Sequence, residues 1–234
     1  MTTAQNSHNG NAKKTIVFCD FDGTITVNDN IIAIIKHFNP EGWESIAERT
    51  ISTELSIQEG VGALFHLLPS SKQEEVVSYG VSNVRIREGF GQFLDYCKEN
   101  DIEFYVTSGG IDFFVYPVLE QFNIAKDHIF CNGSDFSGQR IEIQWPHPCD
   151  EHCTNKCGMC KTTIMRRFPE SEYHRIIIGD SVTDFEGAKL ANAVYSRSHL
   201  TTKCRELGLA HTEYETFHDI IAAMNQERKT VHEL

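Results

Sequence analysis

Short runs of consecutive apolar residues recur along this chain, separated by longer stretches with helical spacing. Runs of this length that are rich in β-branched and aromatic residues predict buried strands. They occupy residues 15–19, 102–106, 128–131, 175–178 and 193–195, with an alternating run at 140–144. Apolar residues three and four apart predict helices at 90–99, 113–122, 162–168 and 185–190, and two more near the C-terminus. The alternation predicts an α/β fold, a Rossmann-like parallel sheet with helices on both faces.

The segment that follows the first predicted strand has a different pattern. Helical spacing alone continues through it, in four amphipathic stretches at residues 30–38, 43–49, 57–68 and 72–79. We therefore expect an inserted all-helical cap domain over residues 28–82. The catalytic α/β core would comprise residues 14–27 and 83–234. The polar residues 1–13 are expected to form a disordered lead-in.

Acidic or hydroxyl side chains follow three of the predicted strands. Asp20 and Asp22 come after the first, Ser108 with two glycines after the second, and Asp180 with Asp184 after a third. Taken singly, each cluster is explained by a helix cap or a turn. The carboxyl ends of strands in an open α/β sheet line one crevice, however, and ligands bind there. The three clusters are therefore expected to converge in space.

Four motifs resemble those of the haloacid dehalogenase-like hydrolases: DFDGT at 20–24, TSGG at 107–110, Lys161, and GDSVTD at 179–184. The helical insertion resembles the cap of the phosphoserine-phosphatase-like branch of that family. Longer runs, among them EGVGALFHLLPSS and WPHPC, are similar to the methionine-salvage phosphatases of bacilli. That group hydrolyses 2-hydroxy-3-keto-5-methylthiopentenyl-1-phosphate. The resemblance implies the same reaction here, and the alternative is a phosphoserine-phosphatase-like hydrolase of another small phosphomonoester.

The resemblance implies an aspartyl-phosphate on Asp20, and the chemistry of the residues agrees. Asp20 would attack phosphorus, while Asp22 would protonate the leaving oxygen and later deprotonate the attacking water. Mg²⁺ prefers oxygen ligands, which Asp20 and Asp180 would supply. By resemblance the backbone carbonyl of Asp22 is a third ligand. Asp184 would orient a metal-bound water from behind.

Phosphate needs donors aimed at its oxygens. Ser108 offers a hydroxyl, Gly109 a backbone N–H and Lys161 an ammonium, although a solvated surface position is the commoner role of a lysine.

The sequence of the cap gives fewer indications of which residues contact the substrate. Asn30 either reaches the substrate or caps the first cap helix, and capping is favoured. The arginines that are candidate anion contacts are more often surface residues; they are Arg49, Arg85 and Arg87.

Four of the eight cysteines lie close together in sequence, at Cys149, Cys153, Cys157 and Cys160. In a reducing compartment such clustering favours structural Zn²⁺ over disulfides, although the spacing is not a common paired knuckle. Free thiols remain a third interpretation. Because Cys160 directly precedes Lys161, anything that orders this loop would also position that lysine.

Composition narrows the choice of partners. Acidic residues outnumber basic ones by 33 to 21, and the net charge of −12 argues against nucleic acid or an anionic membrane. No stretch approaches the ~20 apolar residues of a membrane span, and no signal peptide is recognisable. We expect a cytoplasmic enzyme acting on a small phosphorylated metabolite, with a homodimer left open. A catalytically silent binding module is disfavoured because all four motifs are intact.

Overall fold

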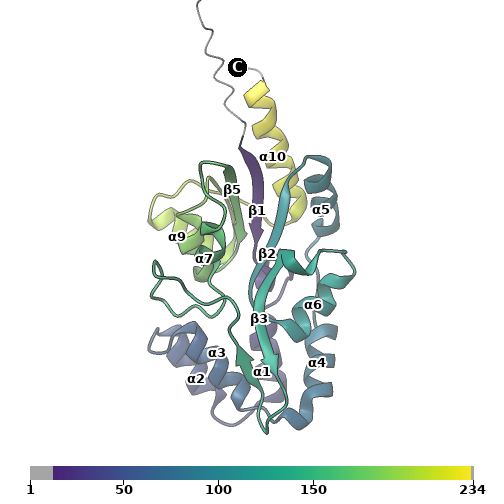
Figure 1. Cartoon of the computed structure of the whole chain (residues 1–234), viewed down its shortest axis with the longest axis vertical. Coiled ribbons are helices and arrows are strands. Elements are labelled where there is room, and N and C mark those ends of the chain that lie inside the picture. Colours follow the sequence, from purple (N-terminus) through teal and green to yellow (C-terminus); the bar gives the residue numbers. More distant parts are fainter. Residues whose placement is uncertain (1–12, 233–234) are drawn as a thin grey trace, which may run out of the picture.

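A central sheet organises the chain, which is described over residues 13–232 of a computed structural model (Figure 1). The expected lead-in over residues 1–13 lies outside the described residues except for Lys13. Seven strands lie in the order β4-β3-β2-β1-β5-β6-β7. Their bounds are β1 Lys14–Cys19, β2 Glu103–Ile111, β3 Ile129–Asp135, β4 Glu142–Gln144, β5 Tyr173–Gly179, β6 Ala193–Ser196 and β7 Thr212–Glu213. All neighbours pair in parallel except β3 and β4, so the predicted α/β class is confirmed.

Two details of the sheet differ from the sequence prediction. β2 does not end before the TSGG motif but continues through it, with a register shift between Thr107 and Ile111. The strand β7 was missed, because its two residues, Thr212 and Glu213, carry no apolar run. Backbone pairing with β6, rather than side-chain pattern, defines that strand.

The alternation of side chains along β1 builds two separate cores. Ile16 and Phe18 face one side of the sheet, while Val17 and Cys19 face the other. The first core packs α7, α8 and α9, and the second packs α5, α6 and α10, so helices cover both faces (Figure 1). The bounds are α5 Phe90–Glu99, α6 Asp112–Glu120, α7 Lys161–Arg166, α8 Phe185–Ala188, α9 Ser198–Glu206 and α10 Phe217–His232.

Between β1 and α5, the described chain contains the π-helical turn Phe21–Ile25, four α-helices and the short 3₁₀ turn Ser70–Lys72. The helices are α1 Asn30–Phe38, α2 Trp43–Ile51, α3 Ile57–His66 and α4 Gln73–Ser82. A capping box between Ser56 and Glu59 fixes the start of α3. These helices gather at one end of the molecule, beside the β3–β4 edge (Figure 1). His66 reaches that edge, with its Nδ1 2.7 Å from a carboxylate oxygen of Glu142.

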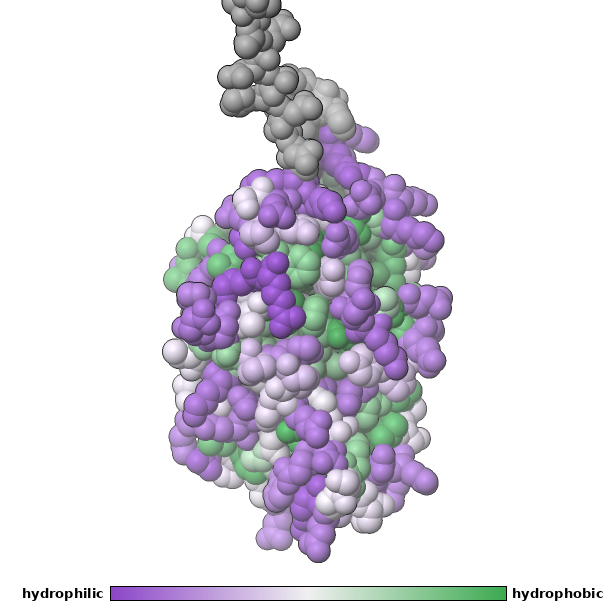
Figure 2. Space-filling model, in the orientation of Figure 1, coloured by the Kyte–Doolittle hydropathy of each residue, from purple (hydrophilic) through white to green (hydrophobic). Residues whose placement is uncertain are grey.

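Polar residues cover most of the face shown in Figure 2, with apolar residues scattered between them. Within residues 13–232, no helix combines the length and apolar character that crossing a bilayer demands.

Candidate active site

Three of the predicted clusters meet at the carboxyl ends of β1, β2 and β5. β1 lies between the other two, so Asp20 directly follows the central strand of this trio. Carboxylate oxygens of Asp20, Asp180 and Asp184 all lie within 4.8 Å of one another. The parallel pairing of β1 with β5 causes this convergence, and the Asp20 N–H donates to the Ile178 carbonyl at 2.9 Å.

Lys161 supplies the positive charge beside these carboxylates. Its Nζ lies 2.8 Å from Oδ1 of Asp20 and also forms a short ion pair with Oδ1 of Asp184. Burial alone would lower the pKa of Lys161, but Asp184 and Asp20 outweigh it and hold the pKa above its usual value. Only 5% of Lys161 is exposed, so it is not a solvated surface lysine. The ammonium is therefore charged and directed at Asp20.

Asp22 is held in place by a residue whose role the sequence did not reveal. Its Oδ1 accepts the backbone N–H of Asn30 at 2.9 Å and the Asn30 side-chain amide at 2.6 Å. Burial, followed by the charge of Asp29, raises the pKa of Asp22 to about 8. The favoured capping role of Asn30 was wrong, since Asp29 caps α1 by accepting the Ile32 N–H at 3.0 Å. Asn30 instead orients a carboxyl group that is protonated near neutral pH.

Glycines allow the motifs to approach so closely. A Cβ on Gly110 would lie 2.8 Å from Oδ2 of Asp22 and 2.9 Å from Oγ of Ser108. Ser108 is fully buried, and its Oγ accepts the Gly110 N–H at 2.8 Å. Gly109 differs, because a Cβ there would meet nothing within 4 Å. The side-chain face of Gly109 therefore borders open space, which leaves room for a ligand next to the backbone.

The acidic cluster has the donors that a hard divalent cation needs. Three carboxylates converge on one point, and oxygen is the ligand that Mg²⁺ favours. Burial, followed by the charge of Asp184, raises the pKa of Asp180 to about 6. A cation at this point would relieve that repulsion. The residues present therefore fit magnesium.

Arg87 proved to be neither an anion contact nor a surface residue. It is 6% exposed, and its guanidinium donates to the carbonyls of Gly23 and Thr24 at 2.8 and 2.7 Å. It also reaches the carbonyls of Thr26 and Glu215, both at 3.2 Å. The Nε and Nη2 groups of this arginine thus hold the loop that carries Asp20 and Asp22, and Nη1 ties that loop to Glu215. Arg49 and Arg85, in contrast, are exposed, as the surface interpretation predicted.

We expect Arg87→Met to lower the free energy of unfolding by at least about 2 kcal/mol, because several buried carbonyls lose a charged donor. Turnover should also fall, since the loop 20–26 positions both aspartates. Chemical denaturation and steady-state kinetics measure the two effects. Arg85→Met is the matched control and should behave like the unmodified protein. Equal stability of the two variants would contradict the role of Arg87.

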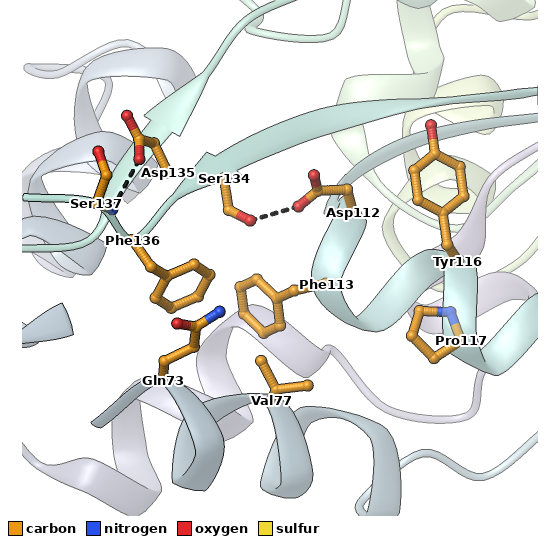
Figure 3. A pocket seen from close by; sticks show the side chains of 10 residues that line it. All are labelled: Gln73, Val77, Asp112, Phe113, Tyr116, Pro117, Ser134, Asp135, Phe136 and Ser137. Carbon is orange, nitrogen blue, oxygen red and sulfur yellow. Dashed lines mark hydrogen bonds between the residues drawn. The ribbon is translucent and has the colours of Figure 1, made fainter. Parts of the chain in front are cut away.

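A pocket of about 640 Å³ lies apart from the carboxylates, between α4, α6 and the end of β3 (Figure 3). The Phe113 and Phe136 rings make an edge-to-face contact there, and Ser134 donates to Asp112 at 2.6 Å. None of Asp20, Asp180 or Asp184 lines this pocket. The pocket is therefore separate from the carboxylate cluster, which stays the candidate active site.

Comparison with known proteins identifies the family. The family model described as haloacid dehalogenase-like hydrolase matches residues 17–189, which is most of the chain and includes all four motifs. The chain belongs to the haloacid dehalogenase-like hydrolase family. The family resemblance predicted from the motifs is thus confirmed.

Some members of this family are about half identical to this chain in sequence. A protein of Brevibacillus brevis named 2-hydroxy-3-keto-5-methylthiopentenyl-1-phosphate phosphatase is 53% identical over 220 residues, covering 94% of this chain and 99% of its own. A protein of that name in Bacillus pumilus is 50% identical, covering 92% of each chain. The predicted resemblance of this sequence to the methionine-salvage phosphatases is therefore confirmed.

Solved structures agree on the fold. One, titled as a phospho-aspartyl intermediate analogue of phosphoserine phosphatase, superposes with a TM-score of 0.65 at 18% identity. It covers 90% of this chain and 99% of that one. At such low identity the likeness shows the fold alone, a sheet and helices arranged as in phosphoserine phosphatases.

Proposed function

We propose that this protein hydrolyses 2-hydroxy-3-keto-5-methylthiopentenyl-1-phosphate to 1,2-dihydroxy-3-keto-5-methylthiopentene and phosphate in methionine salvage. The observation that carries the substrate is the identity of about half of all residues to phosphatases of that name, over nearly their full length. The reaction class has independent support in the buried Asp20–Lys161–Asp184 cluster. A cytoplasmic location is part of the proposal, and the eight unpaired thiols support it.

In the proposed reaction, Asp20 attacks phosphorus and forms an acyl phosphate as the phosphorus–oxygen bond to the leaving group breaks. Asp22, protonated beforehand, gives its proton to the leaving oxygen. It then takes a proton from the water that hydrolyses the aspartyl-phosphate. The Lys161 ammonium compensates the negative charge of the phosphoryl oxygens, and the Ser108 hydroxyl and the Gly109 N–H donate hydrogen bonds to them. The pKa of Asp22, about 8, suits both roles because it gives up and regains a proton near neutral pH.

Mg²⁺ would be held by Asp20, Asp180 and the backbone carbonyl of Asp22. Asp184 would not bind the ion directly but would orient a water molecule bound to it. When bound, the ion supplies positive charge to the phosphoryl group and aligns it with the nucleophile. Asp184 contributes from a fixed position, since its Oδ2 accepts the N–H groups of Asp180 and Ser181 at 3.2 and 3.1 Å.

Removal of divalent cations with EDTA should therefore abolish turnover, and added Mg²⁺ should restore it. Ca²⁺ should inhibit, because it accepts bidentate carboxylates and more ligands, which would turn Asp20 away from attack. Phosphate release in metal-stripped protein with each ion measures this. Full activity in excess EDTA would rule out the magnesium role.

We further propose that residues 28–82, with α1 to α4, form a cap that selects the substrate over a core of residues 14–27 and 83–234. The hydrogen bonds from Asn30 at the start of α1 to Asp22 support this, because they link the insertion to the reaction centre. Closure of such a cap would shield the acyl phosphate from bulk water.

The substrate is tested by comparing kcat/KM for the methylthiopentenyl phosphate and for phosphoserine. We expect a preference of at least about tenfold for the former, or ~1.4 kcal/mol of transition-state stabilisation. Phosphate release with each purified ester at equal Mg²⁺ gives the ratio. Equal efficiency on the two would favour a phosphatase of broader specificity, and a preference for phosphoserine would overturn the substrate assignment.

A further inference from the structure

Four thiols converge in the loop between β4 and α7. The Sγ atoms of this cysteine cluster all lie within 4.8 Å of one another; its members are Cys149, Cys153, Cys157 and Cys160. The Sγ atoms of Cys153 and Cys157 are 3.8 Å apart. That is far longer than the ~2.05 Å of a disulfide. It matches the spacing of about 3.8 Å between ligands of a tetrahedral site whose metal–sulfur bonds are ~2.3 Å.

The loop is shaped around these sulfurs although residues 145–160 contain no helix or strand. The Cys157 N–H donates to Sγ of Cys149 at 3.4 Å, a contact that favours a negatively charged sulfur. Lys156 and Gly158, on either side of Cys157, have φ angles of 51° and 80°. These turns direct the loop back on itself. Ordering so long an irregular segment costs conformational entropy that a handful of hydrogen bonds does not offset.

We propose that these four thiolates bind one Zn²⁺ as a closed structural site. Thiolates select soft or borderline metals, and four of them leave no coordination position for substrate or water. Each ligand binds as its thiol proton passes to solvent, so the site couples folding of the loop to metal binding. The neighbouring histidines, His147 and His152, are not among the side chains that converge here.

The position of the loop indicates what the zinc would do. On one side Cys160 is the residue before α7, and Lys161 begins that helix with its ammonium on Asp20. On the other side the Lys156 carbonyl accepts the Gln58 N–H at 3.1 Å, and the Lys156 ammonium pairs with Glu59 at 3.0 Å. The cluster thus joins the start of α3 to the lysine of the acid cluster. Its effect on turnover, unlike the binding of zinc, rests on the proposed function.

The test is the zinc content of the full-length protein, purified without chelator from cells grown with added zinc. We expect about one Zn²⁺ per chain by elemental analysis. Cys153→Ser should lose most of it, whereas Cys204→Ser should keep it, because Cys204 is buried in α9 outside the cluster. Absence of zinc, iron in its place, or equal zinc in the two variants would overturn the proposal.

A second measurement does not depend on any variant folding. Titration of the unmodified protein with a mercurial thiol reagent, in the presence of a zinc-sensitive dye, should release about one Zn²⁺ per chain. Released zinc should coincide with a lower Tm and with new protease cleavage within residues 145–160. These readouts are independent of substrate, so a failed phosphatase assay leaves the zinc result intact. Oxidised cysteines, counted by thiol titration of the unfolded chain, would count against the site.

Discussion

Asp20→Asn is expected to abolish phosphatase turnover, by at least about a thousandfold, with the fold intact. The amide of asparagine has nearly the shape of the carboxylate but is not nucleophilic, so no aspartyl-phosphate forms. The buried ammonium of Lys161 keeps a partner in this variant, because Asp184 also pairs with it. Loss of activity without loss of structure is therefore the expected combination.

Phosphate release, circular dichroism and Tm, measured on the same preparations, test this expectation. Asp95→Asn is the matched control, since Asp95 is an exposed residue of α5. Asp22→Asn gives a positive comparison, because it retains the nucleophile and should slow hydrolysis of the phosphoenzyme until it accumulates. Near-normal turnover by the Asp20→Asn protein would rule out the aspartyl-phosphate mechanism.

Lys161→Met should have the second-largest effect, on both stability and catalysis. Methionine matches the length of the lysine stem but leaves the buried carboxylates of Asp20 and Asp184 without their cation. Removing one partner of a buried ion pair typically costs about 3–5 kcal/mol. We expect a loss of that order in metal-free protein, and a decrease in kcat/KM of at least about a hundredfold with saturating Mg²⁺.

Denaturant unfolding without metal and kinetics with Mg²⁺ separate the two contributions. Lys189→Met is the matched control, because Lys189 pairs with Glu186 at 2.7 Å on the exposed surface. Such exposed pairs contribute about 0–1 kcal/mol. If Lys161→Met were as stable and as active as Lys189→Met, Lys161 would be no more than a packing residue.

The convergence of Asp20, Ser108 and Asp180 could be predicted from local sequence. Each follows an apolar run that forms a strand of a parallel sheet, and the carboxyl ends of such strands lie at one edge. The helices between residues 28 and 82 were equally predictable, because their apolar spacing is regular. Short-range patterns decide these features, so no knowledge of distant contacts is needed.

The functions of Asn30 and Arg87 could not be predicted in the same way. Asn30 stands where a helix cap is expected, and only the packing of α1 against the loop after β1 turns its amide to Asp22. Arg87 acts through backbone carbonyls of residues 23, 24, 26 and 215. A carbonyl is present at every position, so its partners leave no signal in the sequence.

The sequence by itself determined the family, the sheet and the order of the four motifs, because these depend on residue types at fixed local spacing. It also determined that four cysteines lie near Lys161. Only the tertiary structure decided that their sulfurs meet in one cluster, that Lys161 is buried between Asp20 and Asp184, and that β2 continues through the TSGG motif. Those outcomes depend on chain segments far apart in sequence, whose approach is governed by packing and burial rather than by local pattern.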